Sequence, residues 1–244
     1  MREFFVALGM AVSMFTVLPM PGARWEERLR PLSTALLPAV GLGIGLLWRG
    51  IAALAALLPG YLGGAAIAAT PWLLTGFIHL DGFLDASDAL LSWRPQEERR
   101  RILKDVHVGA FAAVSLMLLA LFQFAAAMEL KRMDALVLLP VLSRCGSARC
   151  ALTMLPLGHS EYAGMEDKRR LAWIPAAAAA LALAALALMC GWRGLAVGGC
   201  ALAGYAAAIL ISTRTLGGFS GDLAGYALTV SELCGLIALA VFQG

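Results

Sequence analysis

Long apolar segments, separated by short charged ones, recur along the whole chain and restrict most strongly what it can fold into. Of its 244 residues, 61% are hydrophobic and only 14% are charged, whereas a soluble domain usually carries about a quarter charged residues. An apolar run of about 20 residues crosses the hydrocarbon core of a bilayer as a helix. No soluble stretch or long linker interrupts the pattern, so the sequence predicts a single integral-membrane domain over residues 1–244.

The apolar runs predict an all-α, polytopic membrane protein with about seven or eight transmembrane or membrane-embedded helices. The first run is short enough that it need not span the bilayer. Because no small-residue cleavage site follows it before "LPMPGARW", we expect it to remain in the mature protein rather than act as a signal peptide. The expected segments are 4–18, 32–58, 62–80, 108–128, 135–155, 171–190, 195–212 and 223–242.

Basic residues are divided unevenly between the alternating loops, and basic residues of short loops gather on the cytoplasmic side of a membrane. Loops 81–105, 158–170 and 214–222 are therefore predicted to face the cytoplasm. The net charge of +3 is spread over short loops, which argues against nucleic acid as a partner. The richer side holds Arg24, Arg28, Arg30, Arg94, Arg99, Arg100, Arg101, Lys104, Lys168, Arg169, Arg170 and Arg214, and the other side holds Arg2, Lys131, Arg132 and Arg193.

The stretch "GFIHLDGFLDASDAL" (76–90) places three carboxylates at the end of an apolar run. Asp81, Asp85 and Asp88 follow the spacing i, i+4, i+7, which puts them on one face of a helix. Converging carboxylates repel one another unless a cation compensates, and hard oxygen ligands favour Mg²⁺, or alternatively Mn²⁺, over zinc. The pattern therefore predicts a metal site. A solvated acidic helix end and a proton or sodium path are the two alternatives.

Other polar residues point to phosphate chemistry near these aspartates. Gly82 would let a phosphate approach the backbone closely. Arg144 lies inside an apolar run, where its guanidinium either binds phosphate or pairs with a buried acid such as Glu232. The segment "RTLGGFSGDLAG" (214–225) gathers glycines around a serine and Asp222, and such turns can cradle phosphate oxygens. His79 is a candidate ligand or base, or an ordinary hydrogen-bonded histidine.

Together these motifs resemble the cobalamin synthase family, the adenosylcobinamide-GDP ribazoletransferases, over nearly the whole chain. The central "TGFIHLDGFLDASDALLSWRPQEERRRILKDVHVG" is similar to the family's TGxxHxDGxxDxxDG segment and its following KDxxxG. The flanking "LPMP", "LSRCGSARC" and "RTLGGFSGDLAGYALTVSELCG" follow the family's order and spacing. The chain departs from the family pattern at Ala89, Val106, His107 and Ser220.

The resemblance implies a Mg²⁺-dependent transferase of the prokaryotic cytoplasmic membrane, with its active site facing the cytoplasm. Such an enzyme joins α-ribazole, or its 5′-phosphate, to adenosylcobinamide-GDP and releases GMP during the last steps of nucleotide-loop assembly in cobalamin biosynthesis. On this reading Asp81, Asp85, Asp88 and Asp222 hold the metal, and Asp105 ligates metal or acts as a base. The substrate-binding residues would be His79, Gly82, Lys104, Arg144, Arg214, Gly217, Gly218 and Ser220.

Two other functions remain as alternatives. A CDP-alcohol phosphotransferase also uses aspartates at a membrane helix end, but its DGxxAR pattern is not matched by "DGFLDASD". A transporter would show internal repeats with paired broken helices, and no convincing repeat is present. The resemblance leaves open whether the chain forms a homo-oligomer or assembles with other late enzymes of the cobalamin pathway.

Overall fold

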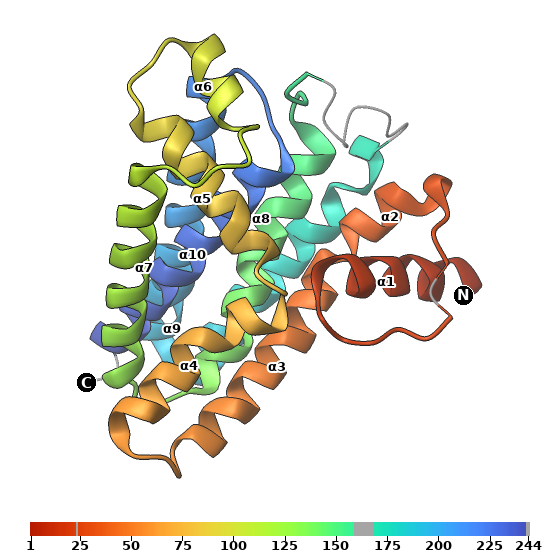
Figure 1. Ribbon diagram of the computed structural model, residues 1–244. Coiled ribbons are helices and arrows are strands. Elements are labelled where there is room, and N and C mark those ends of the chain that lie inside the picture. The colour runs from red at the N-terminus through yellow and green to blue at the C-terminus, as the bar shows by residue number, and fades with distance from the viewer. Residues whose placement is uncertain (23, 159–167, 243–244) are drawn as a thin grey trace.

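The computed structural model describes all residues except 23, 159–167 and 243–244 and is an all-α bundle (Figure 1). Within the residues described, the extended structure is limited to one isolated bridge between Pro156 and Phe219. The predicted fold class is thus confirmed. The helices are α1 (Arg2–Phe15), α2 (Arg30–Ala35), α3 (Leu37–Ala55), α4 (Gly60–Leu74), α5 (Ile78–Leu91), α6 (Gln96–Ile102), α7 (Ala110–Met128), α8 (Leu139–Thr153), α9 (Trp173–Leu216) and α10 (Gly221–Phe242), with 3-10 turns at Glu27–Leu29, Asp134–Val137 and Lys168–Leu171.

Several helices are long and apolar enough to cross a membrane. Among the described residues there are five, or six when the bent pair α4 and α5 is counted as one span. The five are α3, α7, α8 with the turn before it, α9 with the turn before it, and α10. The prediction of a polytopic membrane protein is therefore confirmed. Helix α1 has 14 residues and is about 21 Å long, which is too short to span a bilayer.

Helix α9 is two helices rather than one. Its 44 residues would extend about 66 Å if straight, twice the thickness of a hydrocarbon core. Gly191 has non-helical angles (φ 62°, ψ −144°) and breaks it. A side chain on Gly198 would touch Leu183 and Leu186, which would lie about 18–22 Å away in a straight helix. The chain therefore reverses at Gly191, in agreement with the two segments predicted at 171–190 and 195–212.

The segment predicted as one helix over 62–80 is broken instead. Helix α4 ends at Leu74, α5 begins at Ile78, and the two meet at an angle of 91°. Gly76 and Phe77 both have positive φ, at 59° and 64°, which ends one helix and redirects the next. After the bend, α5 runs beside α10 and packs against it (Figure 1).

Helix α8 lies at the centre of the bundle and packs against α3, α9 and α10. Most of it is buried, including the large side chains Leu139, Leu142 and Leu152. Pro71 in α4 lacks the N–H that would bond to the Ile67 carbonyl four residues earlier. The indole of Trp48 in α3 donates to that carbonyl instead, at 2.8 Å. Such contacts fix α3 and α4 against the core that positions α8.

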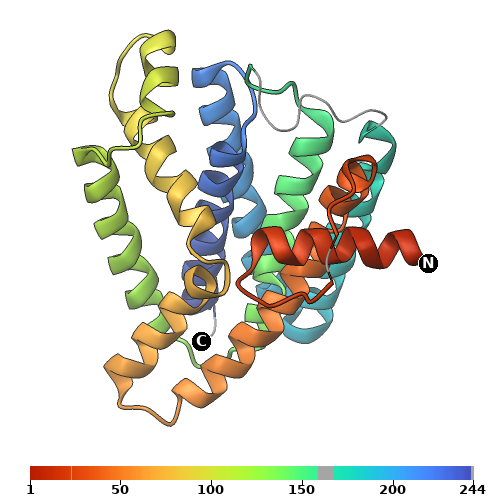
Figure 2. The same ribbon diagram turned by 45° about the vertical axis from the view of Figure 1, so that its right-hand side comes forward.

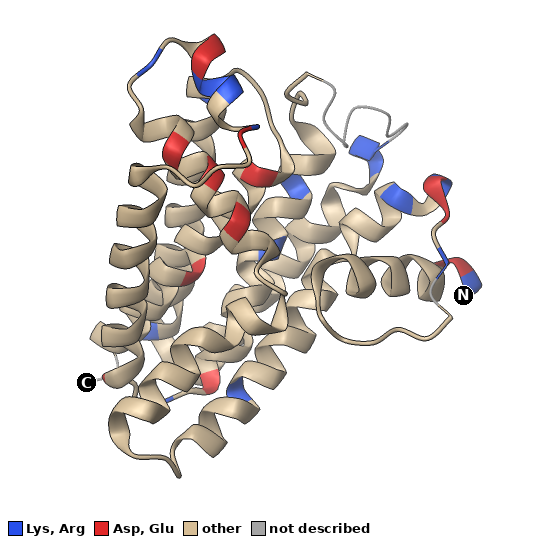
Figure 3. Ribbon diagram, in the orientation of Figure 1, with Lys and Arg blue, Asp and Glu red and all other residues tan. Residues whose placement is uncertain are grey.

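The two ends of the bundle carry different loops. The α5–α7 connection with α6, residues 154–158 after α8 and the α9–α10 turn lie together at the upper end in Figure 1, and the α3–α4 and α7–α8 connections lie at the lower end. Charged residues gather in the upper loops and in the N-terminal region, as Figure 3 shows. The grouping of loops follows the predicted alternation. Helix α1 runs across the bundle rather than along it (Figure 2).

Candidate functional site

A cavity of about 320 Å³ opens where α1, α3, α5, α8 and α10 meet. Two of its polar residues are acidic, Asp81 from α5 and Asp222 from α10. Arg144 and Ser147 of α8 and His79 of α5 also line it. The remaining wall is formed by Met14, Phe15, Leu37, Ile78, Gly221, Ala224, Gly225 and Leu228.

The two acids of the cavity meet because α5 and α10 touch through their backbones. A Cβ atom on Gly82 would lie 2.8 Å from the carbonyl oxygen of Asp222, and one on Gly225 would lie 3.1 Å from that of His79. Contacts under 3.0 Å are essentially never seen for a real Cβ. The space in which we expected Gly82 to admit a phosphate is thus filled by Asp222, and Gly82 serves helix packing.

The three aspartates of α5 lie in different surroundings. Asp81 is exposed and lines the cavity, Asp85 is partly buried and Asp88 is buried. Asp85 is close enough to Asp81, Asp88 and Asp222 for their charges to act on it. The four carboxylates therefore form one strongly negative region, with Asp81 and Asp222 on the open side of it.

Asp88 caps the N-terminus of α7. Its Oδ2 accepts a hydrogen bond from the Gly109 N–H at 2.6 Å and its Oδ1 accepts one from the Ala112 N–H at 2.9 Å. These are N–H groups that the first turn of a helix leaves without partners. A side chain on Gly109 would collide with the Asp88 carboxylate. The helix-cap alternative thus holds for Asp88, although the helix that it caps is α7.

The part of the chain that the structure describes contains no group of three His, Cys, Asp or Glu side chains close enough to hold a metal by themselves. Mg²⁺ does not need such a group, because one or two carboxylates usually bind it together with water and substrate phosphates. Asp81 and Asp222 both line the cavity and offer it hard oxygen donors. They fit this mode of binding, and the wider set that includes Asp85 and Asp88 stays a prediction.

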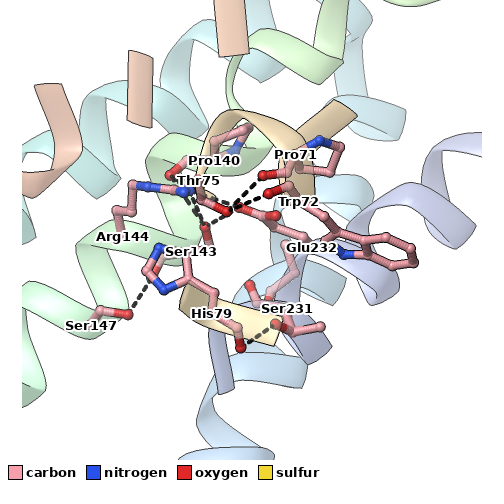
Figure 4. A network of polar contacts seen from close by, with 12 residues as sticks. Pro71, Trp72, Thr75, His79, Pro140, Ser143, Arg144, Ser147, Ser231 and Glu232 are labelled. Atoms are coloured by element: carbon pink, nitrogen blue, oxygen red, sulfur yellow. Dashed lines mark hydrogen bonds and ion pairs between the residues drawn. The ribbon is translucent and has the colours of Figure 1, made fainter. Parts of the chain in front are cut away.

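Arg144 is held inside the bundle by an ion pair. Its Nη1 lies 2.8 Å from Oε1 of Glu232 in α10, and the guanidinium is almost fully buried, with the residue 1% exposed. Nη1 also approaches the Pro140 carbonyl at 3.2 Å, and the Ser143 hydroxyl donates to the same Glu232 oxygen at 2.9 Å (Figure 4). Of the two alternatives for Arg144, pairing with Glu232 is confirmed, yet the residue also lines the cavity.

The glycine-rich turn between α9 and α10 is held by structural contacts. Gly217 ends α9 with φ 83°, and Gly218 packs closely on the backbone of Leu157. Phe219 exchanges backbone hydrogen bonds of 2.9 and 2.7 Å with Leu155 and Leu157. The Ser220 hydroxyl accepts from the Leu223 N–H at 3.4 Å, at the start of α10. A phosphate contact by Gly217, Gly218 or Ser220 stays a prediction, since the cavity wall begins at Gly221.

Two residues of α6 contact this turn and were not singled out in the sequence. The Arg100 Nε donates to the Leu216 carbonyl at 2.6 Å, and the Gln96 amide donates to the Thr215 carbonyl at 3.0 Å. Both carbonyls belong to the last turn of α9, where carbonyl groups lack intrahelical partners. The basic run that follows the aspartates thus contributes to structure. From the sequence, this structural role could have been inferred only from the general rule that carbonyl groups at the end of a helix need hydrogen-bond donors.

Other predicted site residues lie outside the cavity wall. Lys104, Asp105 and Arg214 are exposed and do not line it. Asp105 accepts hydrogen bonds from the backbone N–H and the ring of His107, at 3.0 and 2.7 Å. The side-chain hydrogen bond lowers the pKa of Asp105 below its ordinary value. Conversely, Met14, Phe15 and Ser147 line the cavity although the sequence did not single them out, and only Ser147 lies within a family-like motif, "LSRCGSARC".

Comparison with known proteins gives consistent matches over the whole chain. A family model described as cobalamin-5-phosphate synthase matches residues 7–240. A protein of Clostridium perfringens (strain SM101 / Type A), named adenosylcobinamide-GDP ribazoletransferase, is 37% identical over 254 aligned residues, which cover 99% of this chain and 100% of that protein. Proteins with the same name from Clostridium botulinum (strain Alaska E43 / Type E3) and Pseudomonas savastanoi pv. phaseolicola are 32% and 36% identical, again over 99% of this chain and 100% of theirs. No solved structure matches the chain.

Proposed function

Because the chain belongs to the cobalamin-5-phosphate synthase family, we propose that the cavity between α5, α8 and α10 is where it joins ribazole to adenosylcobinamide-GDP. The protein is an adenosylcobinamide-GDP ribazoletransferase of cobalamin biosynthesis. The observation that supports this location is that Asp81, Asp222 and Arg144 all line one cavity, where the charges of both aspartates act on Asp85. Carboxylates and a guanidinium in one cavity suit a substrate with a diphosphate.

The carboxylates have the chemistry to hold a divalent cation. Asp81 and Asp222 would bind Mg²⁺, with Mn²⁺ as a substitute, and Asp85 would add negative charge beside them. The bound ion would neutralise charge that develops on the diphosphate oxygens during transfer. The apolar residues Phe15, Leu37 and Leu228 would exclude water from the group being transferred.

We place the cavity on the cytoplasmic side of the prokaryotic inner membrane. The support is the loop alternation: the end that carries α6 and the α9–α10 turn holds most of the basic residues outside the N-terminal region (Figure 3). Assembly with further copies of the chain, or with other late enzymes of the pathway, stays a prediction from the family resemblance.

The proposal is tested with purified protein in detergent or liposomes, given adenosylcobinamide-GDP, α-ribazole and Mg²⁺, with GMP and the cobalamin product measured. Asp81→Asn should lower the rate by about 100-fold or more, because one metal-binding carboxylate is lost. Removal of divalent cations with EDTA should stop turnover, and added Mg²⁺ should restore it.

The matched control is Asp134→Asn, which removes an exposed carboxylate that pairs with Arg49, outside the cavity. Its activity should equal that of the wild type. Near-normal turnover by Asp81→Asn, or full activity in EDTA, would show that these carboxylates do not hold a required metal.

A further inference from the structure

One edge of the Arg144 guanidinium has no partner although it is buried. Glu232, Pro140 and Ser143 all contact Nη1, whereas Nε and Nη2 have no hydrogen-bond partner among the described residues. Buried polar groups are nearly always hydrogen-bonded, so an exception in a native structure calls for an explanation. Nε and Nη2 form the side of the guanidinium that can bind two oxygens of one phosphate at once.

The orientation of the Nε–Nη2 edge is set by residues that contact Nη1, the remaining nitrogen of the guanidinium. Figure 4 shows Glu232 and Ser143 grouped around the end of the Arg144 side chain. Oε1 of Glu232 lies 2.8 Å from Nη1 of Arg144 and balances the positive charge of the guanidinium. Glu232 is itself buried, with only 6% of the residue exposed. An arginine with no fixed partner would adopt several rotamers, so the Glu232 contact preorganises the remaining edge.

His79 adds a second unsatisfied group to the same cavity. Its Nε2 is buried and has no hydrogen-bond partner among the described residues. Its ring stacks on Phe15, with the ring centroids 6.0 Å apart and the planes 17° apart, which fixes the ring in place. His79 and Arg144 line one cavity, and the charge of Arg144 acts on His79. The buried nitrogen atoms of Arg144 and His79 that have no hydrogen-bond partner among the described residues therefore belong to side chains of one cavity.

We propose that the Nε–Nη2 edge of Arg144 and the Nε2 atom of His79 form a phosphate-binding subsite of the cavity, and that Glu232 and Ser143 are positioning residues for it. An anion with several oxygens is the matching ligand, because it accepts hydrogen bonds from both nitrogens of the arginine edge, which Glu232 leaves without partners. The acidic pair Asp81 and Asp222 lines the same cavity, so cation and phosphate subsites are adjacent. Two substrate groups share the required chemistry: the diphosphate of the donor and the 5′-phosphate of a phosphorylated acceptor.

The identity of these substrates rests on the proposed function, but binding of the anion can be measured without turnover. Inorganic phosphate is titrated into the purified protein in detergent and EDTA, and the unfolding temperature is followed. Arg144→Met alone would leave Glu232 as an uncompensated buried charge, so both residues are replaced together by methionine, a change that is often tolerated for buried ion pairs. The double variant should bind phosphate at least about tenfold more weakly than the wild type.

Arg149→Met is the matched control, because Arg149 lies on the same helix, is exposed and donates to the Ala172 carbonyl at 3.3 Å. It should bind phosphate as the wild type does. Equal phosphate affinity in the double variant and the wild type would overturn the subsite. Intact phosphate binding without any transfer reaction would refute the proposed function and leave the subsite standing.

Kinetics of Arg144→Lys and Glu232→Gln identify the phosphate that is bound. A KM raised about tenfold for α-ribazole 5′-phosphate, but not for α-ribazole, would assign the acceptor phosphate. A donor KM raised with either acceptor would assign the diphosphate. A purely structural role of the pair would lower the amount of folded protein and leave every KM unchanged, and that result would contradict the proposal.

Discussion

Asp81, Asp85 and Asp88 lie on one helix, yet their carboxylates have different tasks. Asp81 lines the cavity, Asp85 lies partly buried beside it, and Asp88 accepts two hydrogen bonds from the start of α7. A shared helix face in the sequence therefore does not mean a shared function. Each carboxylate is defined by the element that faces it, which is α10 for Asp81 and α7 for Asp88.

Replacement of Asp88 tests its role as a helix cap. Asp88→Asn keeps the size of the side chain but turns one acceptor into a donor, which then faces a backbone N–H. We expect the free energy of unfolding to fall by about 1–2 kcal/mol, as for other lost caps and stranded buried donors. Thermal unfolding in detergent measures it.

Asp85→Asn is the comparison for that experiment. It removes a carboxylate one turn earlier on the same helix and leaves the cap of α7 untouched, so stability should stay close to that of the wild type while activity falls. Equal unfolding temperatures for the Asp88 variant and the wild type would contradict the capping role.

At the scale of single residues, the sequence predicted part of the site. The i, i+4, i+7 spacing placed the aspartates together, and the apolar surroundings of Arg144 gave its two alternatives, one of them the pair with Glu232. The sequence could not show that Asp88 reaches Gly109, because that contact depends on where α7 packs. Nor could it identify Phe15, whose position depends on how α1 crosses the bundle.

At the scale of elements, the site depends on how closely α5 and α10 approach. Gly82 and Gly225 remove the side chains that would keep the two helices apart, and stacking of Phe83 on Tyr226 supports the same crossing. Apolar length predicted most helices well, including the two arms of α9. Apolar length did not predict the break between α4 and α5 at residues 75–77. The apolar run continues through the bend, which shows only in the positive φ values of Gly76 and Phe77.

A methyl group at the crossing should separate the helices. Gly82→Ala places a Cβ 2.8 Å from the Asp222 carbonyl oxygen, and overpacking of this kind usually costs about 1–3 kcal/mol of stability. The rate of the reaction should fall by more than the loss of folded protein explains, because Asp81 and Asp222 move apart. The unfolding temperature and the rate of GMP release measure the two effects.

The control is Gly43→Ala in α3, where a Cβ would meet nothing within 4 Å. Because alanine favours a helix over glycine by up to about 1 kcal/mol, this variant should be as stable as the wild type or slightly more stable. If Gly82→Ala behaves in the same way, the close crossing is not required.

At the scale of the whole molecule, the bundle has two unlike ends, and the cavity lies where five of its helices meet. Of the loops predicted to share a side, the α5–α7 connection and the α9–α10 turn lie together (Figure 1), while residues 159–167 of the third lie outside the described part of the chain. Composition predicted this alternation because membrane insertion depends on charge and apolar length, which are local properties. The cavity depends on contacts between distant segments, so composition alone could not reveal it.

Single cysteines introduced at the two ends test the orientation. The five native cysteines form no disulfide in the structure, and they are first replaced by serine or alanine. In intact spheroplasts, Arg193→Cys should react with a membrane-impermeant maleimide, whereas Arg101→Cys should react only after the membrane is permeabilised. The reverse pattern would place the loop of α6 outside the cytoplasm.

The buried pair of Arg144 and Glu232 also has a consequence for the order in which the protein is made. Arg144 enters the membrane with α8, before the residues of α10 have been synthesised, so the nascent chain carries a cation in the bilayer interior without its counter-charge. Arrival of α10 supplies Glu232 and, a few turns away, Asp222. Neutralisation of the buried charge and completion of the cavity therefore occur in the same step of biogenesis, and a chain truncated before α10 has neither.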